Sequence, residues 1–425
     1  MPVPTHHLLS TAPAIDRAIA SATADPYNGV PRLVFLAATS STPVLYAGKG
    51  GYARLPPFPA SHSQGEGAVP GADDAEPISE DSVFELYSCT KLVGTLTALQ
   101  LVEQGKIALD DDASLYVPQL REARIFEGFD EEGEPILKEN TTPITVRMLI
   151  THTSGFVYYF HDLEAHDKLA AKLDIGVAVY GEKANADWLY KMPLFAKPGS
   201  WFKYGTSIDW LTRVVENVSG LDLESYVQKN IFGPLGITDI SYNVNPAQID
   251  MAFAKLENEV PVGPYEFRLP DRMSTKHRYG GAGLKGPASS YLKLIRALLR
   301  GGELDGARIL RPETVEMMFE PQLDAHQARM LQDAEWKGSE PFSRRKGKSL
   351  EDANWGLGGM LCGTGLASGR SAGSLHWSGM ANTFWVIDRK KDVCFVVFSN
   401  IIPYANDRVF DAWEIIETQL YKGLA

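Results

Sequence analysis

The strongest apolar pattern in the chain predicts a buried helix that begins just after a short strand. Residues 83–87 form a short apolar run, and the residues after position 88 place apolar side chains nearly all round a helix. A helix that is apolar on every side is buried in a protein core. The residues that carry this pattern are Leu92, Val93, Leu96, Ala98, Leu99, Leu101 and Val102. We therefore expect residue 88 to lie at a junction between a strand and a core helix.

Apolar runs that are typical of strands lie near both ends of the chain. They cover residues 32–38, 44–48, 373–379, 383–388 and 392–399, while helical periodicity marks residues 12–23 and 410–421. Strands at both ends and a helical middle predict an α+β fold, in which an antiparallel sheet of N- and C-terminal strands is flanked by helices. We expect residues 1–87 and 275–425 to form the sheet domain. Residues 88–274 are then an inserted, mainly helical region.

Two polar segments complete the pattern. Residues 278–287 form a glycine-rich turn. A nucleotide-binding loop would need a strong strand before this turn and a matching acidic residue downstream, and the sequence shows neither. Residues 322–353 are highly charged with few apolar anchors, which predicts a mobile insertion. Neither segment predicts a cofactor site, and we expect no cofactor.

The composition narrows the possible functions. The net charge of −12 and the pI near 5.3 argue against nucleic acid as a partner. No apolar run reaches the roughly 20 residues that cross a bilayer, and the N-terminus lacks the pattern of a signal peptide. The three cysteines, an odd number without metal-ligand spacing, favour a reduced compartment and no metal site. We expect a cytoplasmic protein without a membrane partner.

Ser88 and Lys91 stand at the start of the predicted core helix, where they would share one helix face. The chain has four Ser-x-x-Lys sequences, but only this one opens a helix that is apolar nearly all round. Burial would lower the lysine pKa, and a neutral amine beside the hydroxyl could accept its proton. The local sequence supports equally well a serine that caps the helix and a lysine that reaches solvent.

A Ser/Lys pair needs a further proton carrier and an oxyanion hole. Tyr204 follows a Pro-Gly turn and precedes an apolar helix, so its phenol could reach the site or pack in the core instead. Tyr158 and Tyr159 belong to an aromatic cluster over residues 156–160. For this cluster, core packing and the rim of a substrate pocket are equally consistent with the sequence.

A predicted strand near the C-terminus ends in Trp377, Ser378, Gly379 and Met380. A glycine in a strand that passes the site permits a close approach of substrate backbone. The backbone N–H of Met380, paired with that of Ser88, could bind the oxyanion, although an ordinary edge strand fits the same residues. Cys89, beside the serine, is expected to pack in the core as an inert thiol.

These motifs resemble those of the class C β-lactamase-like serine hydrolases in order and approximate spacing. That family includes DD-peptidases, family VIII carboxylesterases and fungal acyltransferases of the lovastatin-synthase type. The similarity covers roughly residues 10–421 and rests on Ser88-Cys-Thr-Lys91, Tyr204-Gly-Thr, Trp377-Ser-Gly379 and segments 150–155, 232–239 and 279–284. The resemblance implies a β-lactamase/transpeptidase-like fold. It also implies that Ser88 is the nucleophile, Lys91 its base partner and Tyr204 the second proton carrier.

Two departures from the family pattern favour a neutral, apolar acyl substrate. True β-lactamases and peptidases usually carry Lys-Thr-Gly where this chain has Trp377-Ser378-Gly379. The missing lysine removes a charge that would hold the carboxylate of a β-lactam or of a peptide terminus. Thr206 also replaces the asparagine that is common two residues after the tyrosine.

The expected activity is that of a serine hydrolase or acyltransferase of secondary metabolism. It would form an acyl-Ser88 intermediate and cleave or transfer short-to-medium acyl groups of small-molecule esters or thioesters, with an acyl carrier protein as one candidate donor. Two alternatives stay open, a non-catalytic β-lactamase-like scaffold or binding protein and a weak β-lactamase. The presence of Ser88, Lys91 and Tyr204 argues against the first, and Trp377 argues against the second.

Overall fold

An eight-stranded antiparallel sheet forms the centre of the molecule, with the order β12-β13-β14-β15-β16-β1-β2-β3. The computed structural model describes residues 9–54, 76–158, 163–173, 188–244, 252–253, 263–264, 278–333 and 351–424. The strands are β1 (Arg32–Ala38), β2 (Tyr46–Arg54), β3 (Glu76–Pro77), β12 (Asn354–Trp355), β13 (Met360–Leu361), β14 (Leu375–Gly379), β15 (Thr383–Asp388) and β16 (Val393–Phe398). N-terminal β1 pairs with C-terminal β16, with Phe35 opposite Val397. This topology confirms the predicted α+β fold.

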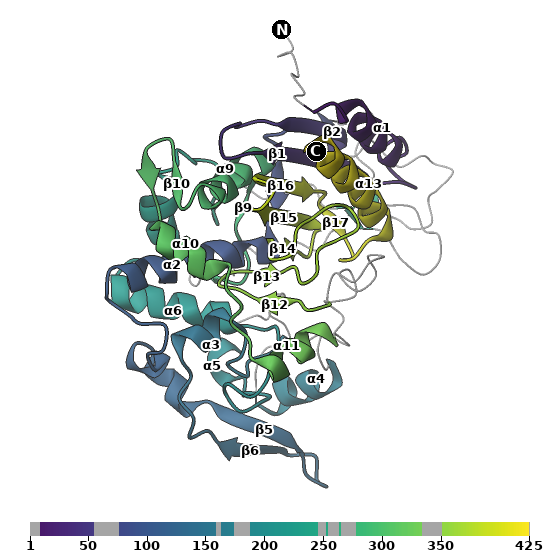
Figure 1. Ribbon diagram of the computed structural model, residues 1–425. Coiled ribbons are helices and arrows are strands. Elements are labelled where there is room, and N and C mark those ends of the chain that lie inside the picture. The colour runs from purple at the N-terminus through teal and green to yellow at the C-terminus, as the bar shows by residue number, and fades with distance from the viewer. Residues whose placement is uncertain are drawn as a thin grey trace.

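The central strands of the sheet, β14, β15, β16 and β1, are buried on both faces because helices cover each side (Figure 1). Successive side chains of a strand point to opposite faces. In β1, Leu33 and Phe35 join the core under α1 (Ala12–Ala22) and α13 (Asp407–Leu424). Val34 and Leu36 join the opposite core, where α2 (Thr90–Glu103) and α9 (Ala288–Leu299) pack. A strand buried on both faces is apolar at every position, which explains the continuous apolar run in the sequence.

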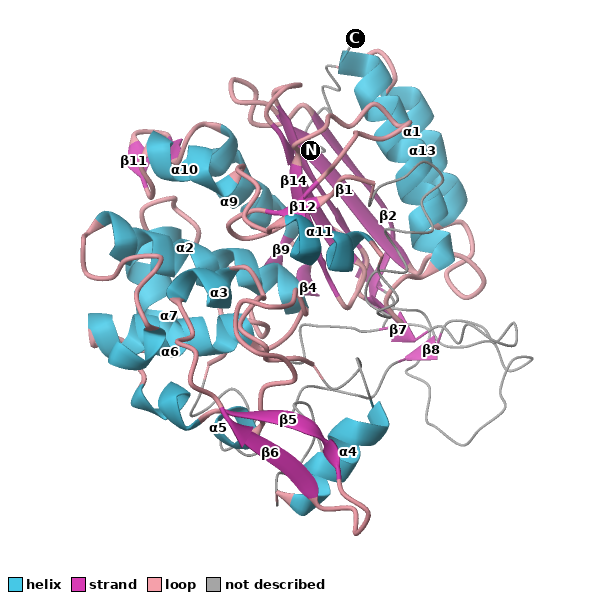
Figure 2. Ribbon diagram, turned by 60° about the horizontal axis from the view of Figure 1, so that its bottom comes forward, coloured by secondary structure: helices cyan, strands magenta, loops and turns pink. Residues whose placement is uncertain are grey.

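The helix α13 lies beside α1 on the outer face of the sheet, as both views show (Figures 1 and 2). Its buried stripe is formed by Val409, Ala412, Trp413, Ile416, Leu420 and Tyr421. Most positions between them are polar, as expected for a helix with one face on a core, and Ile415 is an exposed exception. None of the helices in the described ranges combines the length and the apolar character that a membrane span needs.

A mainly helical region lies on the other side of the sheet (Figure 2). It contains α3 (Val146–Ile150), α4 (Leu163–Lys172), α5 (Trp188–Lys191), α6 (Ser207–Ser219), α7 (Leu223–Val227) and a hairpin of β5 (Arg124–Phe129) and β6 (Pro135–Glu139). Strand β4 (Val83–Glu85) leads from the sheet side into α2 and pairs with β9 (Lys285–Pro287). The proposed boundaries of the sheet domain and the helical region stay a prediction.

Short elements complete the described structure. They are η4 (Ala113–Leu115), η5 (Pro118–Glu122), η7 (Gln228–Phe232), β7 (Ala252–Phe253), β8 (Gly263–Pro264), β10 (Glu303–Leu304), β11 (Ala307–Arg308), α10 (Pro312–Met318) and β17 (Ile401–Ile402). Small sheets join β10 to β11, and β17 to β7 and β8.

The prediction of a mobile insertion over residues 322–353 is wrong for its first part. Residues Ala325–Gln332 form helix α11, which begins with a capping box between Asp324 and Gln327. The buried side chains of Ala328 and Leu331, three residues apart, anchor this helix to the core. The buried Gln327 also donates to the Gly199 carbonyl at 2.8 Å, which ties this charged segment to the helical region. Residues 334–350 lie outside the described residues.

Candidate active site

Ser88 lies in a tight turn, η3 (Tyr87–Cys89), between β4 and the buried helix α2. Tyr87 has a φ of 42°, a left-handed conformation that costs energy for a residue other than glycine. The turn is held where the Leu86 N–H donates to the Leu284 carbonyl at 3.1 Å. Ser88 is only half-buried, although the residues around it are buried. Ser88 is therefore the partly exposed residue of this turn.

Lys91 lies one turn further into α2 and is 2% exposed. Its Nζ is 3.1 Å from Ser88 Oγ, 2.8 Å from the Tyr158 hydroxyl and 2.7 Å from the Gly281 carbonyl oxygen. The interpretation as a lysine that reaches solvent is therefore wrong. Ser88 does not cap α2 either, because the cap position is Cys89 and it makes no side-chain cap bond.

The environment of Lys91 makes both the neutral amine and the ammonium form accessible near neutral pH. Burial lowers its pKa to about 7, while the charge of Asp209 and the neighbouring Cys89 act in the opposite direction. The Gly281 carbonyl can only accept, so a neutral amine donates one N–H to it and retains one more N–H and a lone pair. If the second N–H goes to Tyr158, the lone pair faces Ser88. The contacts thus suit both an ammonium group and a base that receives the serine proton.

Two tyrosine rings enclose the Lys91 amine, each with its centroid 4.9 Å from Nζ. The buried Tyr158 hydroxyl accepts a hydrogen bond from the amine, so Tyr158 lies beside the lysine. Tyr204 is buried as well, and its ring centroid lies 5.5 Å from that of Tyr158. Tyr159, which we predicted with Tyr158 as a substrate-binding residue, lies outside the described residues.

Trp377 connects β14 to Tyr204. Its indole Nε1–H donates to the Tyr204 hydroxyl at 3.0 Å, across 173 residues of sequence. Trp355 packs edge-on against Trp377, with ring centroids 4.6 Å apart, and His152 lies 4.7 Å from the Tyr204 ring. The Tyr204 hydroxyl thus accepts a neutral N–H from Trp377 within an aromatic wall.

The end of β14 packs against the nucleophile turn. A Cβ on Gly379 would lie 2.3 Å from the Leu86 carbonyl oxygen, so the backbone of the turn occupies the space that a side chain would need. The glycine is therefore explained by protein packing, and its approach to substrate stays a prediction. Ser378 shares a 2.6 Å hydrogen bond with the Tyr404 hydroxyl. Met380 follows directly and is half-buried.

Cys89 is unsuited to act as a nucleophile, as expected. Burial raises the pKa of its thiol to about 12, although a bond to Thr383 and the charge of Lys91 act against this. All three cysteines of the chain are buried and unpaired.

Sequence reasoning left Asp209 and Gly281 without a role. Asp209 is 3% exposed in the first turn of α6, and its Oδ1 accepts the Gly281 N–H at 2.7 Å. Gly281 belongs to the glycine-rich turn that we rejected as a nucleotide loop and counted among the family motifs, without assigning it a contact. The sequence held one signal for Asp209, an acidic residue directly before the apolar positions of a helix. We gave it no role because a carboxylate in the first turn of a helix usually lies at an exposed helix end.

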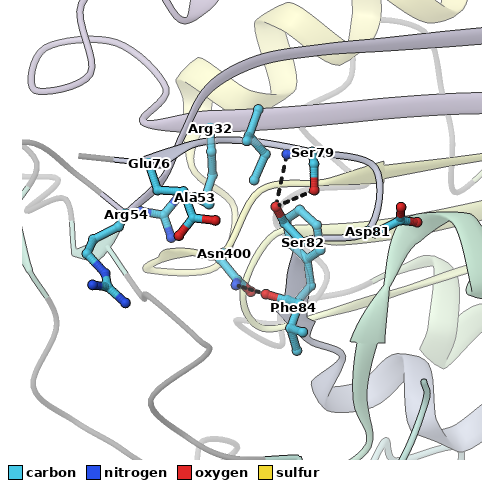
Figure 3. Close-up of a pocket in the computed structure, with 11 residues that line it drawn as sticks. Arg32, Ala53, Arg54, Glu76, Ser79, Asp81, Ser82, Phe84 and Asn400 are labelled. Carbon is cyan, nitrogen blue, oxygen red and sulfur yellow. Dashed lines mark hydrogen bonds between the residues drawn. The ribbon is translucent and has the colours of Figure 1, made fainter. Parts of the chain in front are cut away.

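A separate polar cavity of about 310 Å³ lies beside β4 (Figure 3). Its wall includes the charged side chains of Arg32, Arg54, Glu76 and Asp81, together with Asn400. None of the residues that we predicted for catalysis or substrate binding lines this cavity. The Ser88 site is therefore a different place in the molecule.

Comparison with known proteins shows the family. The family model described as Beta-lactamase matches residues 43–420. Monacolin J acid methylbutanoyltransferase of Aspergillus terreus is 32% identical over 358 residues, which cover 81% of this chain and 83% of that enzyme. Lovastatin esterase of Penicillium rubens is 31% identical, and the alignment covers 82% of this chain and 87% of the esterase.

Solved structures show the same relationship. Unliganded simvastatin synthase (LovD) from Aspergillus terreus has a TM-score of 0.79 at 27% identity, with 97% of each chain covered. EstCE1, a hydrolase with promiscuous acyltransferase activity, has a TM-score of 0.72 at 22% identity, covers 97% of this chain and 98% of that chain, and shows a shared fold. The chain therefore belongs to the beta-lactamase family and is an enzyme of its acyltransferase and esterase group.

Proposed function

We propose that the enzyme transfers acyl groups through an acyl-Ser88 intermediate, with Lys91 as the base and Tyr204 as the second proton carrier. The observation that carries this proposal is the buried Lys91 amine, 3.1 Å from the half-buried Ser88 hydroxyl. A nucleophile within hydrogen-bond distance of a base whose pKa is near neutral is the arrangement that serine activation requires.

In the acylation step, Ser88 Oγ forms a bond to the carbonyl carbon of the ester or thioester. The serine proton passes to Lys91 Nζ, and the carbonyl oxygen becomes an oxyanion that the backbone N–H groups of Ser88 and Met380 stabilise. Collapse of this intermediate breaks the bond to the leaving alcohol or thiol. That leaving group takes a proton from the Tyr204 hydroxyl, which Lys91 reprotonates in turn.

Deacylation reverses these roles with a new acceptor. Water or an alcohol gives its proton to the Tyr204–Lys91 pair, and its oxygen forms a bond to the acyl carbonyl carbon. Collapse of this second intermediate breaks the bond between that carbon and Ser88 Oγ, which takes the proton back from Lys91 as the acid or the new ester leaves. Hydrolysis and transfer share the first half-reaction and differ only in this acceptor. The relatives named above include both a transferase and an esterase, which is consistent with either outcome.

We propose neutral small-molecule esters or thioesters with short-to-medium acyl chains as substrates, in secondary metabolism and in the cytoplasm. Trp377 occupies the position where a lysine would bind a carboxylate, and the surrounding wall is aromatic. Methylbutanoyl transfer, named for the Aspergillus terreus relative, fits this class of acyl group. An acyl carrier protein is a candidate donor because it presents its acyl group as a thioester.

Intact-mass spectrometry with a panel of acyl esters and thioesters tests the proposed function. We expect the mass of one acyl group to be added, and peptide mapping to place it on Ser88. An adduct on another residue, or turnover without any trapped or kinetically detectable acyl-enzyme, would contradict the mechanism. Strong cephalosporin turnover would instead support the β-lactamase alternative.

The Trp377→Phe substitution should slow acylation by p-nitrophenyl butyrate about fivefold, because it removes the N–H that donates to the Tyr204 hydroxyl. A single neutral hydrogen bond is usually worth about 1 kcal/mol. Single-turnover kinetics gives the rate. Trp355→Phe is the matched control, because its ring packs against both Trp377 and Tyr204. If both variants slow the reaction equally, the effect comes from packing and not from the hydrogen bond.

A further inference from the structure

Three parts of the chain meet at Gly281. Its N–H donates to Asp209 Oδ1 of α6 at 2.7 Å, and its carbonyl oxygen accepts from Lys91 Nζ of α2 at 2.7 Å. One peptide segment therefore links a buried carboxylate to the buried amine. The mechanism proposed above uses the amine but assigns no part to the carboxylate.

The packing around Gly281 fixes this link. A Cβ at this position would lie 2.7 and 2.8 Å from the two Asp209 carboxylate oxygens and 2.8 Å from the Tyr158 hydroxyl. The preceding Gly280 donates its N–H to Thr212 Oγ1 at 3.1 Å, so the turn is also attached one helical turn further along α6. There is no room for a side chain at residue 281 between the carboxylate and the phenol that contacts Lys91.

Asp209 is an unusual residue for this position. It is 3% exposed, and the cost of burying a carboxylate is large unless charge or hydrogen bonds compensate for it. Burial raises its pKa to about 6, whereas Lys91, the Gly281 N–H and Arg213 lower it. Arg213 is itself engaged by Glu216 at 2.8 Å. The buried amine and the buried carboxylate thus stabilise each other's charged forms.

We infer that Asp209 is the buried counter-charge of Lys91 and that, through Gly281, it positions the amine and determines when the amine gives up its proton. This inference rests on the proposed function and deepens it. Asp209 makes no contact with the reacting atoms in this account, so it is a positioning residue. Its negative charge favours the ammonium form, so it keeps the amine protonated to a higher pH than burial alone would.

The test is the pH profile of Ser88 acylation in Asp209→Asn, measured as the second-order rate with p-nitrophenyl butyrate from pH 5 to 9. The amide can still accept the Gly281 N–H but carries no charge. The acid limb of the profile is the pH range in which the rate falls as Lys91 becomes protonated. Without the negative charge, Lys91 loses its proton at lower pH, so the acid limb should shift to lower pH by about one unit or more. The plateau rate should change less than the limb position. An acid limb that stays in place or moves up overturns the inference.

Two further variants keep the test decisive. Asp209→Ser is a smaller neutral acceptor and should move the limb in the same direction, so the test survives if one variant does not fold. Asp388→Asn is the matched control, because Asp388 is also buried and accepts a backbone N–H, from Ser371 at 2.8 Å, but lies on β15. Its limb should coincide with that of the wild type. If the control moves as far as Asp209→Asn, the effect is not specific to Lys91.

The two proposals fail in different ways. If wild-type Ser88 forms no acyl adduct with any donor, the proposed function is overturned, and this inference falls with it. If Ser88 is acylated but the limb is unchanged in both neutral variants, only the role of Asp209 is overturned. A purely structural role would lower the plateau rate and the unfolding temperature without moving the limb.

Discussion

Ser88→Ala should abolish covalent labelling by a fluorophosphonate probe and reduce ester turnover by at least about a thousandfold. The substitution removes the atom that forms the acyl bond, and no other group at the site can replace it. Because the side chain is half-buried and small, the folded structure should persist. Burst kinetics with p-nitrophenyl butyrate, together with intact-mass spectrometry, measures both effects.

The neighbouring thiol provides the control for this experiment. Cys89→Ser keeps the size of the side chain next to the nucleophile but removes the thiol, whose pKa is raised to about 12 by burial. We expect labelling and turnover in this variant to remain close to the wild-type values. If Ser88→Ala keeps the burst and Cys89→Ser loses it, the covalent step takes place on the cysteine, and the proposal is overturned.

Much of the fold was predictable because its elements have local signatures. Strand β1 is apolar at each of its positions after Arg32 since both of its faces are buried, and this pattern is visible in the sequence alone. The pairing of β1 with β16 follows from the presence of strands at both ends of the chain. Helix α11 was missed because its signals are a cap at Asp324 and three buried side chains, one of them polar, within a highly charged segment.

Periodicity predicted the site only where its contacts are local, whereas Tyr204 and Trp377 were identified by the resemblance to a family. Ser88 and Lys91 are three residues apart on one helix turn, so their proximity follows from helical geometry. The contacts of Lys91 with Tyr158 and Gly281 join positions 67 and 190 residues away. Sequence periodicity does not report such pairs. The same limit applies to Asp209, whose place in a first helical turn is normally typical of an exposed carboxylate.

Glycines illustrate the same difference between pattern and packing. The glycine-rich turn near residue 280 has the composition of a phosphate-binding loop but lacks its context. In the structure these glycines permit backbone to pack closely on α6, and at residue 281 against the Tyr158 hydroxyl. Gly379 likewise accommodates the Leu86 carbonyl beside the nucleophile. Which atoms fill the space beside a glycine depends on distant segments and cannot be derived from the local sequence.

Lys91→Met should slow acylation of Ser88 by about a thousandfold, the range expected when a general base is lost. Methionine has a similar length and is apolar, so it can fill the buried space without a charge. The Gly281 carbonyl and the Tyr158 hydroxyl would each lose a partner, and some loss of stability is expected. Single-turnover kinetics over pH 5 to 9 gives the rate, and thermal unfolding confirms that the variant is folded.

The pH profile distinguishes a lost base from a damaged site. In the wild type, acylation should decline as the pH falls below about 7, because the amine whose pKa burial lowers to that value becomes protonated. In Lys91→Met this limb should disappear. Lys293→Met is the matched control, since Lys293 belongs to another Ser-x-x-Lys sequence but is exposed on α9. If Lys91→Met acylates within tenfold of wild type, the serine proton must leave by way of a tyrosine, and Lys91 only holds that tyrosine in place.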